Sequence, residues 1–69
     1  MDKQELKKLL EEKEAELEVE RHKLDGLFAE KVSLNKPLTT NDILQQNDTC
    51  ADISLEVTEL KKLLEEFED

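Results

Sequence analysis

The sequence predicts an all-α fold, an antiparallel two-helix coiled-coil hairpin. Three observations support it: a composition rich in Glu, Lys and Leu, leucines that recur in steps of three and four, and a single proline near the middle. The 69 residues are 42% charged and 36% hydrophobic, with one glycine and two aromatic side chains, as is typical of coiled coils. A chain this short forms one small domain that is marginal alone, so we expect a partner or a parent chain.

The first helix is expected over about residues 3–34. Its core positions are marked by six leucines: Leu6, Leu10, Leu17, Leu24, Leu27 and Leu34. The repeat is complete only if Lys13, Glu20 and Lys31 fill the remaining core places. This side of the hairpin is therefore an interrupted apolar stripe.

Two local signals bear on the first helix. Asp2 followed by Glu5 resembles a capping box, which predicts a helix start near residue 3. Gly26 lies inside the helix and costs about 1 kcal/mol relative to alanine. It marks either a flex point, a close crossing, or a glycine that the surrounding packing tolerates, and the last is favoured.

A turn is expected at about residues 35–39. Pro37 disfavours helical geometry at Lys36 and cannot donate a helical hydrogen bond. The side-chain oxygens of Thr39, Thr40 and Asp42 can cap a new helix, with Thr39 and Asp42 spaced as a capping pair. One helix should end before this stretch and a second begin after it.

The second helix is expected over about residues 40–68. Its core positions form a nearly complete heptad series: Ile43, Gln46, Cys50, Ile53, Val57, Leu60, Leu64 and Phe67. Only Gln46 is strongly polar. A short turn favours antiparallel neighbours, so the two series should face each other and form the seam of the hairpin.

A register can be derived from the spacing. Antiparallel layers have a constant sum of residue numbers, and one choice gives three layers that are apolar on both sides. It pairs Leu10 with Leu64, Leu17 with Val57, Leu24 with Cys50, and Lys31 with Ile43. The same register sets Lys13 near Leu60 and Glu20 near Ile53, where their long stems can cover apolar surface.

Apolar residues also remain outside the seam. They are Leu9, Val19, Phe28, Val32, Leu44, Leu55 and Leu63. Some are expected to be ordinary exposed residues, but together they suggest a face on which another helix or another copy of the chain docks.

Charge and missing motifs restrict the function. The net charge of -9 disfavours direct binding to nucleic acid or anionic lipid, and no apolar run is long enough for a membrane span. His22 has no metal-binding companion, and Cys50 is expected to be a core residue in a cytosolic protein rather than a nucleophile. We expect no enzyme activity, no metal and no cofactor.

Several short strings resemble the N-terminal coiled-coil region of hantavirus nucleocapsid proteins. In the first half they are Glu5-Leu6, Leu10, Leu17, Arg21, Lys23-Leu24 and "EK" at 30–31. In the second they are "LNK" at 34–36, "LT" at 38–39 and "ELKKLL" at 59–64. The chain lacks the proline that usually precedes "LNK" and is more acidic, as a divergent member would be.

The resemblance implies an antiparallel hairpin at the start of the polypeptide that helps nucleocapsid subunits associate. A separate basic core would bind the genomic RNA, so this segment would contact neighbouring subunits but no nucleic acid. The implied location is the virion nucleocapsid and the host cytoplasm. The alternative is a hairpin that pairs with a different protein in a cytosolic cellular scaffold.

Overall fold

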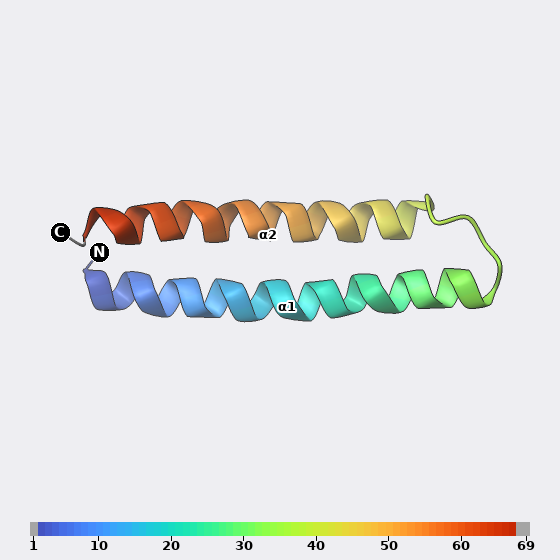
Figure 1. Ribbon diagram of the computed structural model, residues 1–69, viewed down its shortest axis with the longest axis horizontal. Helices are drawn as coiled ribbons and strands as arrows, with labels where there is room; N and C mark the ends of the chain where they lie inside the picture. The colour runs from blue at the N-terminus through green and yellow to red at the C-terminus, as the bar shows by residue number, and fades with distance from the viewer. Residues whose placement is uncertain (1, 68–69) are drawn as a thin grey trace.

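A computed structural model describes residues 2–67, and these residues form an all-α helical hairpin (Figure 1). Helix α1 spans Lys3–Ser33 and helix α2 spans Asn41–Glu66. The helices lie antiparallel and side by side, so the start of α1 and the end of α2 share one end of the rod and the turn occupies the other. The molecule measures 52 × 16 × 15 Å. It is therefore a rod about as long as its longer helix and only slightly wider than a single helix.

The start of α1 is capped by Asp2. Its Oδ1 accepts a hydrogen bond from the backbone N–H of Glu5 at 2.8 Å, and its backbone carbonyl accepts one from Leu6 at 3.0 Å. Asp2 has extended backbone angles, as an N-cap residue should. The negative charge also lies at the positive end of the helix dipole.

The end of α1 is a Schellman motif centred on Asn35. Asn35 has a φ of 57°, in the left-handed region that asparagine tolerates better than most residues. Its N–H donates to the carbonyl of Val32 at 3.1 Å, and the N–H of Lys36 donates to the carbonyl of Lys31 at 2.9 Å. Pro37 follows at once and prevents any continuation. The helix therefore ends at Ser33, and the connection runs from Leu34 to Thr40.

Helix α2 begins with Thr40 as its N-cap residue, one place later than the predicted cap Thr39, which is exposed in the turn. The Thr40 side chain makes no capping bond to the backbone but bonds to the carboxylate of Asp42. Asp42 in turn accepts from the N–H of Ile43 at 2.9 Å. The predicted pairing of Thr39 with Asp42 is wrong because the N-cap lies one residue later, at Thr40, so that Asp42 is the second helical residue and not the third, which a capping pair requires.

The core lies along the line where the two helices meet. Seven side chains of the expected seam are buried: Leu6, Leu10, Leu17, Ile43, Cys50, Ile53 and Val57. Leu24, Leu60 and Leu64 pack against them and are half-buried, as is Leu27. No residue of the seam is charged and fully buried among residues 2–67.

Two residues expected in the seam lie outside it. Leu34 is 54% exposed and Phe67 is 48% exposed. Leu34 follows the end of α1, where α2 has not yet begun alongside, and Phe67 is the C-cap residue at the far end of α2. Within residues 2–67, neither has a turn of the opposite helix beside it to cover it.

The predicted register is displaced by about one helical turn. That register placed Glu20 near Ile53, about two turns along α2 from Gln46, yet Gln46 Nε2 lies 2.8 Å from the backbone carbonyl oxygen of Glu20. Lys13 likewise reaches Glu56 rather than the turn around Leu60. Figure 1 shows the same stagger, since α2 begins short of the end of α1.

The displacement has a geometric reason. Core positions advance in alternating steps of three and four residues, and an antiparallel partner presents these steps in reverse order. The predicted register set steps of three opposite steps of four. Sliding α2 by about one turn toward the start of α1 makes equal steps face each other, and the longer connection from Leu34 to Thr40 permits it.

Candidate association surface

The polar residues at core positions of α1 (Lys13, Glu20 and Lys31) bond to side chains of α2 within the hairpin. Lys13 Nζ lies 2.9 Å from Glu56 Oε2 on the opposite helix and 3.6 Å from Glu16 Oε2 on its own. The hydrogen bond to Glu56 and the charges of Glu16 and Glu56 raise the pKa of Lys13. Lys13 therefore joins the two helices at the edge of the seam.

Glu20 and Gln46 form a second polar contact across the seam. Gln46 Nε2 donates to Glu20 Oε2 at 2.6 Å as well as to its backbone carbonyl, and Lys23 Nζ lies 3.2 Å from Glu20 Oε1. The hydrogen bond from Gln46, then that from Lys23, lowers the pKa of Glu20. Its side chain is only 18% exposed.

A third polar contact closes the seam at the turn. Lys31 Nζ lies 3.2 Å from Asp42 Oδ2. The Thr40 hydroxyl lowers the pKa of Asp42 most, and Lys31 and the N–H of Ile43 add to this. Within residues 2–67, no buried side-chain nitrogen or oxygen lacks a hydrogen-bond partner. The polar groups of the seam are thus all bonded within the hairpin, so groups that could bind a partner lie on its outer surface.

The seven residues expected on a partner face are on the outside of the hairpin to different degrees. Val19, Val32, Leu44, Leu55 and Leu63 are between 47% and 66% exposed. Leu9 and Phe28 are half-buried. The exposed set also includes Leu38 in the turn, which was not expected.

These residues do not share one face, because residues about seven apart lie on the same side of a helix. Leu9 is seven residues before Glu16, and Leu63 is seven residues after Glu56. Both leucines therefore lie on the flank of the hairpin where Lys13 bonds to Glu16 and Glu56. Phe28, Val32 and Leu44 lie on the opposite flank of the hairpin. The single stripe that the sequence suggested is therefore divided.

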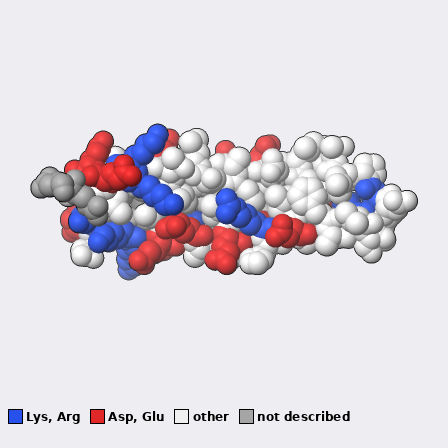
Figure 2. Space-filling model, in the orientation of Figure 1, with Lys and Arg blue, Asp and Glu red and all other residues white. Residues whose placement is uncertain are grey.

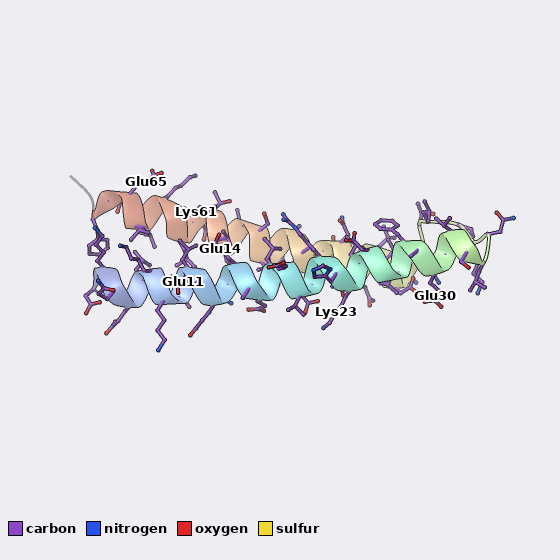
Figure 3. All side chains as sticks on the ribbon, turned by 60° about the horizontal axis from the view of Figure 1, so that its bottom comes forward. Glu11, Glu14, Lys23, Glu30, Lys61 and Glu65 are labelled. Atoms are coloured by element: carbon purple, nitrogen blue, oxygen red, sulfur yellow. The ribbon has the colours of Figure 1, made fainter. Side chains whose placement is uncertain are left out.

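That opposite flank contains a shallow open groove of about 510 Å³ between the helices. Buried Leu17 and Val57 form its floor. The walls come from both helices: Glu14, Glu18 and Arg21 of α1, and Ser54, Thr58 and Lys61 of α2. Figure 3 shows Glu14 and Lys61 on the same side of the hairpin, one on each helix.

The groove continues toward the turn as an apolar surface. Phe28 is seven residues from Arg21, and Val32 is fourteen from Glu18, so both extend the α1 wall. Leu44 is fourteen residues from Thr58 and extends the α2 wall in the same way. We call this flank, from Lys61 and Glu14 to Val32 and Leu44, the groove face. The spacing of its residues is visible in the sequence, but which residues of α1 lie beside which residues of α2 depends on the register.

Charge is distributed unevenly along the rod. On the face shown in Figure 2, charged side chains gather toward the end that holds the start of α1, and the turn end is largely uncharged. Residues 24–50 contain only six charged side chains: Asp25, Glu30, Lys31, Lys36, Asp42 and Asp48. The exposed apolar residues near the turn therefore have few charges around them.

Other candidate groups lie apart from this surface. His22 is exposed and lies 3.9 Å from Glu18, and Cys50 is buried in the seam. In the described part of the chain, no group of three or more His, Cys, Asp and Glu side chains is placed to hold a metal ion. Neither α1 nor α2 contains a stretch long and apolar enough to cross a membrane.

Comparison with protein-family models, curated proteins and solved structures gives no match for this chain. The resemblance to the hantavirus region therefore rests on the short strings quoted above. Of these, "LNK" at 34–36 coincides with the Schellman motif that ends α1.

Proposed function

We propose that this chain is an assembly module, a helical hairpin that associates with further copies of itself through apolar residues left outside its seam. The observation that carries the proposal is the amount of large apolar surface on so small a rod. In the part of the chain that the structure describes, eight such side chains are 45% or more exposed: Val19, Val32, Leu34, Leu38, Leu44, Leu55, Leu63 and Phe67. Exposed apolar residues that gather in patches mark interaction sites.

The limited core supports the same role. Among residues 2–67, only seven apolar side chains are buried, and they lie in a single line between two helices. A chain of this size buries a low fraction of its surface, so covering more apolar area by association stabilises the folded state. Self-association and folding are then coupled.

The resemblance to the hantavirus region indicates the kind of protein in which the module acts. We place the module in a viral nucleocapsid protein, where it would bring subunits together while a separate basic core packages the genomic RNA. The net charge of -9 is in keeping with that division, because an acidic arm is repelled by phosphate groups. In this setting the protein acts in the virion nucleocapsid and the host cytoplasm.

Sedimentation equilibrium across a concentration series tests self-association. We expect the mean mass to rise above 8.0 kDa with concentration and the rise to strengthen with added salt, which screens repulsion between acidic copies. A chain that stays monomeric at millimolar concentration and high salt would contradict the proposal. A monomer that instead captures a different protein would support the cellular scaffold.

The viral setting is tested separately by sequencing the gene that encodes this segment. A basic RNA-binding core in the same polypeptide would support the nucleocapsid role. A parent protein without one, in which this hairpin still self-associates, would leave an assembly module and remove the viral setting.

A further inference from the structure

We propose that a second copy of this chain docks on the groove face in parallel, about a two-fold axis that runs along the rod. Helix α1 of each copy then faces α2 of the other, and the two turns lie at the same end. This inference rests on the proposed function and names the surface and the orientation of the partner. Three features of the groove face lead to it.

The first feature is the position of the apolar residues. Val32 and Leu44 are 66% and 48% exposed, Phe28 is half-buried, and all three lie at the turn end of the groove face. The contact of Gln46 with Glu20 sets the stagger and brings Leu44 alongside the turn of α1 that holds Phe28. A parallel two-fold places Leu44 of each copy against Phe28 and Val32 of the other. An antiparallel copy would set these residues against the charged end instead.

The second feature is the distribution of charge across the groove. The α1 side carries three acids, Glu11, Glu14 and Glu18, and one base, Arg21, so it is acidic on balance. The α2 side carries no acid between Leu44 and Lys61, since its residues on this face are Leu44, Asn47, Ala51, Ser54, Thr58 and Lys61. When α1 faces α2 of the other copy, each acidic wall meets hydroxyl groups and a lysine. Two copies of net charge -9 thereby avoid acid against acid.

The third feature is the size of the side chains on the α2 wall. Ala51 and Ser54 are small, which allows a neighbouring helix to approach the groove closely. Lys61 lies at the charged end and lines the same groove as Glu14 (Figure 3). Within residues 2–67, Lys61 forms no ion pair in the single hairpin, so its ammonium group is available to the acids of a second copy. With three apolar anchors per copy, the interface is small, and the dimer is expected to be weak.

Two exposed leucines of α2 provide a matched test. Leu44 lies on the groove face and Leu55 does not, and their exposures of 48% and 59% make serine similarly tolerable for folding at both sites. We expect Leu44→Ser to raise the dissociation constant about tenfold and Leu55→Ser to change it less than about twofold. The readout is sedimentation equilibrium. The reverse ranking would overturn the groove-face assignment.

Two adjacent lysines test the charge argument. Lys61→Glu and Lys62→Glu alter the net charge equally, but only Lys61 lines the groove. We expect Lys61→Glu to weaken association about tenfold more than Lys62→Glu, because it sets acid against Glu11 and Glu14 of the other copy. Equal effects of the two substitutions would contradict the proposed contact.

Orientation is tested by spin labels placed singly at Lys8→Cys and Ala29→Cys. The background is Cys50→Ala, or Cys50→Val if alanine reduces helicity measured by circular dichroism. The two sites are about 32 Å apart along α1. In a parallel dimer the two labels of each pair lie at the same height along the rod, so the distances at both sites are set by the width of the dimer alone. An antiparallel dimer adds a separation of about 30 Å along the axis to at least one pair.

The outcomes separate this inference from the proposed function. A wild-type chain that remains monomeric contradicts both. A chain that associates, but loses association with Leu55→Ser and not with Leu44→Ser or Lys61→Glu, contradicts the groove face alone. A label pair whose distance includes the axial separation of about 30 Å contradicts the parallel orientation alone.

Discussion

Gln46 binds Glu20 at two points, since its Nε2 lies 2.8 Å from the Glu20 backbone carbonyl oxygen and 2.6 Å from Glu20 Oε2. The carbonyl is a fixed point on α1, so this contact sets how far α2 slides along it. A slide by one turn would leave the Glu20 side chain, only 18% exposed, without the amide donor. The pair is thus a polar contact that fixes the register of an otherwise apolar seam.

The coupling energy between Gln46 and Glu20 can be measured by a double-mutant cycle. We expect Gln46→Ala to lower the thermal midpoint by several degrees, and to lower it less when Glu20→Ala is already present, because the lost contact is shared. Circular dichroism follows the unfolding. Gln45→Ala is the control, since the Gln45 side chain is exposed and has no hydrogen bond across the hairpin among the described residues. Equal effects of Gln46→Ala in both backgrounds would show that the pair is not coupled.

Acid should weaken the hairpin through Glu20 and Asp42. Folding lowers the pKa of each carboxyl group below its ordinary value, 4.5 for Glu20 and 3.8 for Asp42, because the folded state binds the charged form. Their stabilisation is complete above those values and is lost as the pH falls through the lowered pKa. Urea unfolding at neutral pH should therefore show Glu20→Gln to be less stable than Glu12→Gln, which has the same net charge.

At a pH below the lowered pKa of Glu20 this difference should disappear, because Glu20 is then protonated and uncharged in the Glu12→Gln variant too. A gap between the two variants that is the same at both pH values would rule out a charged Glu20 as its source.

Alkaline pH should weaken the contact between Lys13 and Glu56. Folding raises the pKa of Lys13 above 10.5, first through the hydrogen bond to Glu56, so its stabilisation is present below 10.5 and is lost as the pH rises through the folded value. At neutral pH, we expect Lys13→Glu to destabilise the hairpin and Lys13→Glu with Glu56→Lys to recover part of the loss. Recovery remains partial because Glu16 repels the new acid. A double variant less stable than Lys13→Glu would contradict the pairing.

Asn35 should tolerate glycine and resist alanine. Its φ of 57° costs a residue with a Cβ about 1 kcal/mol or more, which asparagine partly offsets and glycine avoids. We expect Asn35→Ala to lower the free energy of unfolding by about 1 kcal/mol and Asn35→Gly to leave it equal or higher. Asn47→Ala, inside α2, should instead raise it through helix propensity. A stable Asn35→Ala variant would argue against the Schellman motif.

Gly26 should be replaceable by alanine with a gain in stability. Helix α1 runs through it without interruption, and a Cβ added there meets nothing within 4 Å, so Gly26 does not serve a close crossing. Gly26→Ala should raise the free energy of unfolding by about 0.5–1 kcal/mol, and Ala29→Gly, also exposed on α1, should lower it by a similar amount. Loss of stability in Gly26→Ala would show that the glycine is needed for flexibility.

Much of the candidate surface could be predicted residue by residue, but not as a surface. Phe28, Val32 and Leu44 are recognisable in the sequence as apolar residues outside the seam. Their separation from Leu55 and Leu63 follows from the antiparallel pairing of the two core series, and the stagger of the helices decides which residues of α1 lie beside which residues of α2. The groove walls at Glu14 and Lys61 were missed because neither residue is unusual within its own helix.

The sequence alone determined the two helices, the break at Pro37 and most of the seam, because heptad spacing, caps and proline act over a few neighbouring residues. Only the tertiary structure decided the register and which ends of the seam stay open, as Leu34 and Phe67 show. That choice depends on Glu20 and Gln46, which are 26 positions apart, and on a turn that starts at the left-handed backbone of Asn35. Alternative registers of the two helices form different contacts between distant segments. Local spacing in the sequence does not show which register has the lowest free energy.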